Sequence, residues 1–191
     1  MLYPLVFMSS RCTIQKRCKK QKFSYTGGTG APAVGQTVTG GTSLNTAVIT
    51  KLGAGYLVLK DLSGAFTIGE TISTTTFSGT LSTQADYTNQ YGEFEYYWYD
   101  DQTSVPCRFG YSGSGKEGVF IHETGQLLDL PVKVVLPDTI SLAGNQEDWA
   151  TEYRISTTTS GFAGTYQIVS PYVSNGIFEI DHYSFILKAV Q

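Results

Sequence analysis

The chain has 191 residues and a mass of 20.8 kDa, and 41% of its residues are hydrophobic, 13% aromatic and only 15% charged. That length suffices for one domain, or for a small domain with an added module, and the apolar content argues against wholesale disorder. The abundance of Thr, Gly and Tyr favours strands and tight turns, excludes a coiled coil and argues against a helical bundle.

Charge is unevenly distributed along the chain, although the net charge is only −3. Residues 11–22 contain bases and no acid, whereas residues 86–191 contain fourteen acids and five bases. A basic arm therefore precedes an acidic body. Such an arm can meet nucleic acid, an acidic partner or the chain's own body, and a solvated cluster of charges is the simpler alternative. The candidate partner-binding residues in this arm are Arg11, Lys16, Arg17, Lys19, Lys20 and Lys22.

The N-terminal segment, residues 1–23, is expected to hold this arm and a first strand. The alternation over Arg11–Lys16 predicts that strand, with Cys12 and Ile14 on one face. The first eight residues are apolar, but no charge precedes them and the run is too short to cross a bilayer, so we expect no targeting or membrane segment. Three cysteines at low density predict free thiols rather than a disulfide framework.

Residues 24–86 form a second region, which carries few charges and many Gly, Thr, Ser and Val residues. It contains an internal repeat, in which Gly30–Thr39 matches Gly64–Ser73 at an offset of 34 residues. The glycines are spaced as turn residues, and two copies are too few for a solenoid. We predict a compact β module built from two similar hairpins, with a further strand at Gly55–Lys60.

Residues 87–191 are predicted to form a β-barrel domain, with strands spaced as in a small barrel or sandwich. Only Gly144–Thr151 reads as a helical turn. Asn175 and Gly176 are a hairpin-turn signal. The predicted strands are Val105–Tyr111, Leu130–Leu136, Tyr153–Ser156, Thr165–Ser170 and Ile177–Val190.

An aromatic stretch, Tyr91–Tyr99, opens this region with alternating residues. The alternation predicts that Phe94, Tyr96 and Trp98 fill the core and that the intervening Tyr97 and Tyr99 lie at an interface. The alternative is a stacking platform for sugars or bases, since exposed Tyr and Trp form such platforms.

Residues 110–118 are rich in glycine and are predicted to form a turn or a flexible loop. Its candidate partner-binding residues are Gly113, Ser114, Gly115 and Lys116.

No motif for catalysis or cofactor binding stands out. His122 and His182 are not placed in a nucleophile motif, and the adjacent pairs Asp100-Asp101 and Glu147-Asp148 suit turns better than a glycosidase site. The glycine-rich stretches lack the helix that a phosphate loop needs, and no Cys/His cluster has metal-ligand spacing. We therefore expect a protein that is not an enzyme and needs neither cofactor nor metal.

The chain resembles the head-closure, or neck, proteins of tailed bacteriophages. Arg11–Lys16 is similar to the opening strand of that family, and the remaining matches lie in the last hundred residues, in the family's order. The repeat region is similar to Gly-Glu-Thr modules of phage virion proteins, which here appear as Gly69-Glu70-Thr71. The other matching segments are Pro106–Phe109, Val132–Pro137, Asp138–Ile140, Tyr153–Ile155, Gly164–Val169 and His182–Val190.

The resemblance implies an all-β protein, with a small β-barrel and an additional small β module inserted after its first strand. It implies a structural role in the virion neck, after assembly in the host cytoplasm. Copies of the chain would form a ring, as a hexamer or dodecamer, between the portal-adaptor assembly and the tail proteins. DNA would pass through the ring without sequence-specific binding, and the basic arm would dock on an acidic neighbouring ring.

Two alternatives stay open. The first alternative is another structural part of the virion, such as a tail terminator, a tail-tube protein or a capsid-decoration protein. A carbohydrate-binding adhesin module is the alternative from a different class, and it requires Tyr97, Trp98 or Tyr99 to be exposed in a groove.

Overall fold

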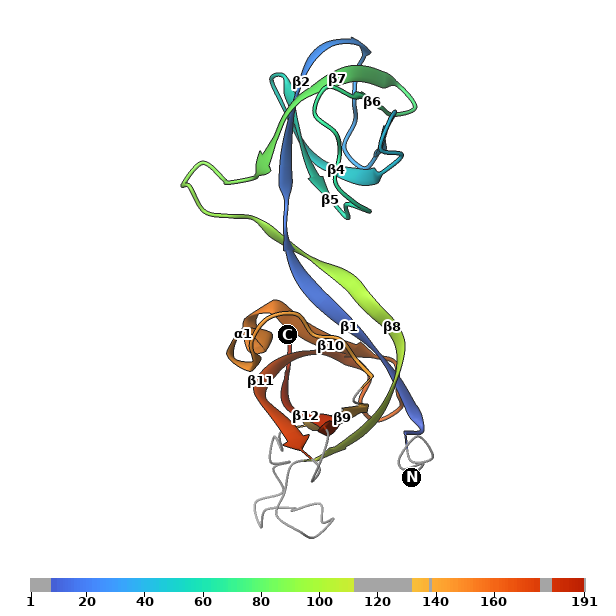
Figure 1. Cartoon of the computed structure of the whole chain (residues 1–191), viewed down its shortest axis with the longest axis vertical. Helices are drawn as coiled ribbons and strands as arrows, with labels where there is room; N and C mark the ends of the chain where they lie inside the picture. The colour runs from blue at the N-terminus through green and yellow to red at the C-terminus, as the bar shows by residue number, and fades with distance from the viewer. Residues whose placement is uncertain (1–7, 112–131, 138, 176–179, 191) are drawn as a thin grey trace. The chain divides into compact units, whose positions relative to one another are not determined.

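The computed structural model describes residues 8–111, 132–137, 139–175 and 180–190. Most of them belong to strands, which form two closed barrels of six strands each (Figure 1). The predicted all-β fold with a small barrel is therefore confirmed. The loop at residues 110–118, with the candidate residues Gly113, Ser114, Gly115 and Lys116, lies largely outside the described residues, as do His122 and Gly176.

Each barrel belongs to its own compact unit. The terminal unit consists of Met1–Lys16 and Asp100–Gln191, and the inserted unit consists of Arg17–Tyr99. The region boundaries predicted from the change in composition, at 23/24 and 86/87, both fall inside the inserted unit. The first lies elsewhere because β2 (Gln21–Gly30) is one strand, whose charged first residues belong to the same barrel as its uncharged end. The second lies elsewhere because the backbones of Tyr87 and Glu95 are hydrogen-bonded to Lys20, which keeps residues 87–95 with the inserted unit.

The barrel of the terminal unit runs in the order β1-β10-β11-β12-β9-β8. Chain-terminal β1 therefore lies between β10 and β8 (Figure 1). The predicted helical turn is α1 (Gln146–Glu152), which packs mainly on β11. The strands are β1 (Ser10–Lys19), β8 (Tyr96–Tyr111), β9 (Val132–Pro137), β10 (Tyr153–Thr157), β11 (Gly164–Asn175) and β12 (Ile180–Ala189).

The core of the terminal unit draws on every one of these strands. Cys12 and Ile14 face inward from β1, as their alternation predicted, and are 3% and 1% exposed. Tyr153 is 1% exposed and accepts a hydrogen bond from the Ala143 backbone N–H at 2.9 Å, so its hydroxyl does not lie unpaired in an apolar core.

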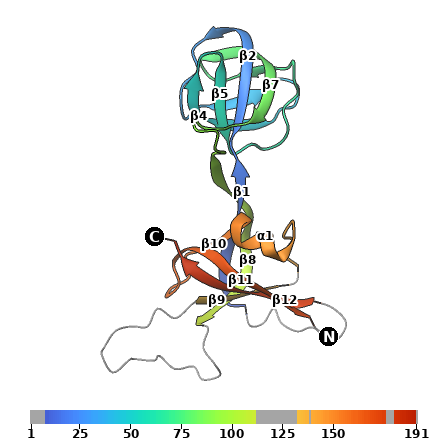
Figure 2. The same cartoon turned by 90° about the vertical axis from the view of Figure 1, so that its left-hand side faces the viewer.

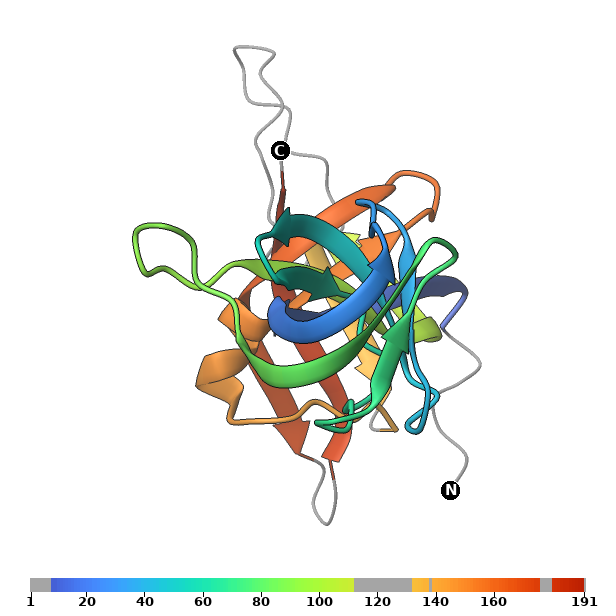
Figure 3. The same cartoon turned by 90° about the horizontal axis from the view of Figure 1, so that it is seen from above.

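The barrel of the inserted unit runs in the order β2-β5-β4-β3-β6-β7. Figure 2 shows β2, β4, β5 and β7 side by side, and Figure 3 shows strands of this unit curving around one another. Its separate core centres on Phe23, which is fully buried and meets Phe66 edge to face, with ring centroids 4.9 Å apart. The strands are β2, β3 (Thr37–Gly40), β4 (Thr46–Gly53), β5 (Tyr56–Lys60), β6 (Thr71–Ser73) and β7 (Phe77–Asp86).

The sequence repeat has a direct structural counterpart. In each copy a turn precedes a short strand, which pairs with the strand that follows it, giving the hairpins β3–β4 and β6–β7 as predicted. Gly35 and Gly69 occupy the same turn position with φ of 87° and 89°, a conformation that favours glycine. Since β3 and β6 also pair antiparallel, the two copies are hydrogen-bonded directly to each other.

Gln36 and Glu70 occupy the same position in the two copies of the repeat. Their side chains connect the two copies by hydrogen bonds. Each side chain accepts a hydrogen bond inside its own turn, from the N–H of Ala33 at 3.0 Å and of Thr67 at 2.7 Å. Each then reaches the loop of the other copy. Gln36 bonds the hydroxyls of Thr74, Thr75 and Thr76, and Glu70 bonds the N–H groups of Thr42 and Ser43 and the Ser43 hydroxyl.

Glu70 is a buried charge, with only 4% of its surface exposed. Burial alone would raise its pKa, but four hydrogen bonds from Ser43, Thr67 and Thr42 outweigh burial and lower the pKa below its usual value. The carboxylate therefore stays ionised at neutral pH and holds the turn and the opposite loop together.

Candidate functional site

The six basic residues singled out in the sequence are divided between the two units. Residues 10–30 form two consecutive strands, β1 and β2, and not a free arm. Arg11 and Lys16 belong to the terminal unit, and Arg17, Lys19, Lys20 and Lys22 belong to the inserted unit.

A hairpin over residues 87–95 lies beside the bases of the inserted unit. Its two sides are joined by a hydrogen bond from the Asn89 N–H to the Glu93 carbonyl and by a bridge between Thr88 and Phe94. Lys20 anchors its base, since the Lys20 N–H donates to Glu95 and the Tyr87 N–H donates to the Lys20 carbonyl, both at 2.8 Å. The hairpin extends away from the barrel of its unit (Figures 1 and 3).

The aromatic residues of this stretch are not in a core. Phe94 and Tyr96, predicted to fill one, are 45% and 38% exposed, and Trp98 is half-buried outside both core clusters. The prediction was wrong because residues 87–95 turn back as a hairpin, and so do not run as one strand across a barrel. Tyr97 is half-buried and Tyr99 is 44% exposed.

These exposed rings receive the basic side chains. The Arg17 guanidinium lies 3.7 Å from the centroid of the Tyr96 ring, and the Lys19 ammonium lies 4.0 Å from that of Phe94. We call the whole set the cationic–aromatic surface. Its members are Arg17, Lys19, Lys20, Lys22, Lys51, Tyr56, Tyr87, Phe94 and Tyr96, with Lys22 at 4.4 Å over Tyr56 and Lys51 at 5.3 Å over Tyr87.

Two carboxylates neutralise part of this positive charge. Asp86 accepts a hydrogen bond from Lys19 at 2.7 Å, and Glu95 accepts one from Lys20 at 2.9 Å and another from Lys51. These hydrogen bonds, from Lys19 to Asp86 and from Lys51 and Lys20 to Glu95, lower the pKa of both acids. Five cations thus face two anions, which leaves the surface net positive.

Arg17 and Lys22 differ from the other three cations. Within the described part of the chain, neither forms an ion pair or donates a side-chain hydrogen bond. Each is held over a ring, which fixes the direction of the side chain without using its N–H donors. An arginine in this setting presents a planar set of donors suited to carboxylate or phosphate.

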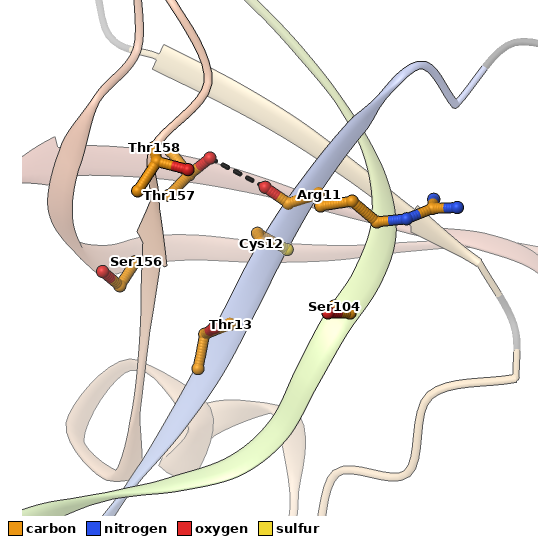
Figure 4. A pocket seen from close by; sticks show the side chains of 7 residues that line it. All are labelled: Arg11, Cys12, Thr13, Ser104, Ser156, Thr157 and Thr158. Carbon is orange, nitrogen blue, oxygen red and sulfur yellow. Dashed lines mark hydrogen bonds between the residues drawn. The ribbon is translucent and has the colours of Figure 1, made fainter.

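A small pocket of about 180 Å³ lies in the terminal unit, among β1, β8 and β10 (Figure 4). It is lined mainly by hydroxyls, and Thr157 already donates to the Arg11 carbonyl at 2.8 Å. The Arg11 side chain points away from the threonine cluster in Figure 4. The lining residues are Arg11, Cys12, Thr13, Ser104, Ser156, Thr157 and Thr158.

Two of the three cysteines, Cys12 and Cys107, are hydrogen-bonded to each other. All three are free, as expected, and Cys12 and Cys107 are buried in the same core. A hydrogen bond with Cys107, together with burial, raises the pKa of Cys12 and keeps it a thiol. Among the described residues no three His, Cys, Asp or Glu side chains come together as metal ligands do.

The described part of the chain contains no helix with the length and apolar character needed to span a bilayer. No family model, curated protein or solved structure matches the chain. What the cationic–aromatic surface can bind therefore follows only from its own geometry and charge. Sequence reasoning missed this surface because the basic run, residues 11–22, contains no aromatic residue and the aromatic stretch, Tyr91–Tyr99, contains no base, so that only the fold brings them together.

Proposed function

We propose that the chain is a structural protein of a tailed-phage virion, and that its copies form a ring at the head–tail junction. The ring would continue the DNA channel and join the portal-adaptor assembly to the tail proteins. In this role the protein works mechanically, without a catalytic centre or a cofactor.

One observation carries the proposal. The terminal barrel combines β1, from the N-terminal part of the chain, with β8 to β12 from its last hundred residues, and a second closed barrel stands between them in sequence. This is the arrangement that the resemblance to neck proteins implies, with a module inserted after the first barrel strand. The charge of the terminal unit also supports the proposal. With seven basic and eleven acidic residues it has a net charge of −4, which weakens attraction to DNA phosphates passing nearby.

The number of copies per particle tests the proposal. Absolute quantification of the chain by mass spectrometry in purified particles should find on the order of ten copies, as one closed ring requires. Hundreds of copies would indicate a tail-tube or capsid-decoration protein instead. Absence from every particle would contradict a virion role.

A carbohydrate-binding module is the second candidate, and exposed rings favour it. Tyr91 at the tip of the 87–95 hairpin is 78% exposed, and Tyr99 is 44% exposed. Exposed tyrosine faces stack on sugar rings, so this function predicts binding on a glycan array that a Tyr91→Ala and Tyr99→Ala double variant loses. No binding by the intact chain would contradict this function and leave the virion role unaffected.

A further inference from the structure

We propose that the cationic–aromatic surface of one copy binds an acidic surface on the terminal unit of a second copy. The contact deepens the proposed function, since a ring needs one patch that meets a different patch on its neighbour. The two surfaces involved lie in different units of the chain and carry opposite charge.

The acidic surface is built around the loop at residues 141–145. Gln102 bonds both the Asp101 carboxylate, at 3.4 Å, and the Ser141 carbonyl, at 2.7 Å, and so places Asp101 beside this loop. The carboxylates of Asp148 and Glu152 both lie close to Gly144. A methyl group placed on Gly144 would be 3.7 Å from the first carboxylate and 3.9 Å from the second. The loop therefore connects three acids.

These three acids have no basic partner within the described residues. Asp101 and Asp148 are exposed and Glu152 is half-exposed. Glu152 also ends α1, which has no base in its last turn to balance the negative end of the helix. Cations supplied by a second copy would compensate part of this negative charge.

On the cationic–aromatic surface, Arg17 and Lys22 are the cations available to such acids. Their stacking on Tyr96 and Tyr56 sets them in place before binding, which reduces the entropy lost on association. Protein carboxylates fit this surface better than nucleic acid does. Asp86 and Glu95 already hold three of the five cations and would repel a continuous row of phosphates.

Charge reversal of either surface tests the contact in the full-length protein. Sedimentation velocity should show that the wild-type chain self-associates, more weakly as salt is raised. Self-association should weaken about ten- to a hundredfold in Arg17→Glu with Lys22→Glu, and also in Asp101→Lys with Asp148→Lys and Glu152→Lys. Mixing the two variants should restore association, because each then offers the surface that the other lacks.

The control is Lys60→Glu with Lys133→Glu, which changes the net charge as much as the first variant but lies outside the surface. It should associate like the wild type. The proposal is overturned if the wild-type chain stays monomeric at its highest soluble concentration, or if the mixture does not associate. It is also overturned if the wild-type chain instead binds a labelled DNA oligonucleotide that the Arg17→Glu, Lys22→Glu variant does not bind.

The failure of this contact would be distinguishable from the failure of the proposed function. If particles contain about ten wild-type copies and incorporate the charge-reversed variants equally well, the virion role stands and the contact is wrong. If the chain is absent from particles but the reversed variants associate only when mixed, the contact stands and the virion role is wrong.

Discussion

Replacing Phe23 by alanine is expected to lower the free energy of unfolding of the inserted unit by about 3–5 kcal/mol, the usual cost of removing a buried phenylalanine ring. Phe23 is fully buried and loses its edge-to-face contact with Phe66. The two tryptophans make this measurable, because Trp98 lies in the inserted unit and Trp149 in the terminal unit. Denaturant unfolding followed in single-tryptophan variants should show an earlier transition at Trp98 only.

Phe185→Ala is the matched control for that experiment. Phe185 is 1% exposed in the core of the terminal unit, so its replacement should shift the transition seen by Trp149 and not that seen by Trp98. A common shift of both transitions in either variant would contradict the view that the two cores fold separately.

Glu70→Gln is expected to destabilise the inserted unit by about 2–4 kcal/mol, although it changes a single atom of the side chain. The carboxylate only accepts hydrogen bonds, from two groups of Ser43 and from the N–H groups of Thr42 and Thr67. A glutamine would turn an NH₂ group toward some of these donors and leave them unsatisfied in a buried site. Thermal or denaturant unfolding observed through Trp98 measures this loss.

The reverse substitution, Gln36→Glu, is the control that the repeat provides. Gln36 bonds hydroxyls of Thr74, Thr75 and Thr76, which can rotate to donate to a carboxylate, so its replacement should cost much less than that of Glu70. Equal losses in the two variants would contradict this account.

The pH dependence of unfolding also tests how much the Glu70 carboxylate stabilises the inserted unit. Because its folded-state pKa is lowered, the carboxylate stabilises the unit above the unfolded-state value of about 4.3, and this stability is lost as the pH falls through the folded-state pKa. Glu70→Gln should therefore remove part of the acid sensitivity of the inserted unit.

The sequence predicted those parts of the fold in which local pattern and tertiary structure agree. The repeat indicated two similar hairpins because the turn glycines Gly35 and Gly69 recur at equivalent positions. The alternation of Cys12 and Ile14 indicated an inward face because β1 has one side on the core. The unusual member of the repeat, Glu70 in place of Gln36, was visible as a difference, but burial by another segment cannot be read from local pattern.

The prediction failed where one pattern fits two structures. Alternation over Tyr91–Tyr99 suits a strand with a buried face, but Asn89 and Gly92 allow the chain to turn back as a hairpin that leaves Phe94 in solvent. The boundary near residue 23 was misplaced for a related reason. A strand can carry charged residues at one end and uncharged residues at the other, so a change in composition need not mark the end of a unit.

Gln36 and Glu70 make the inserted barrel resemble a dimer enclosed within one chain. Each copy of the repeat supplies the group that holds the loop of the other, so neither copy is complete by itself. A chain with one copy alone would need a second molecule to satisfy those loops, as in a symmetric dimer. Joining the two copies in one chain makes that pairing intramolecular, so the two positions can differ, one an amide and the other a buried carboxylate.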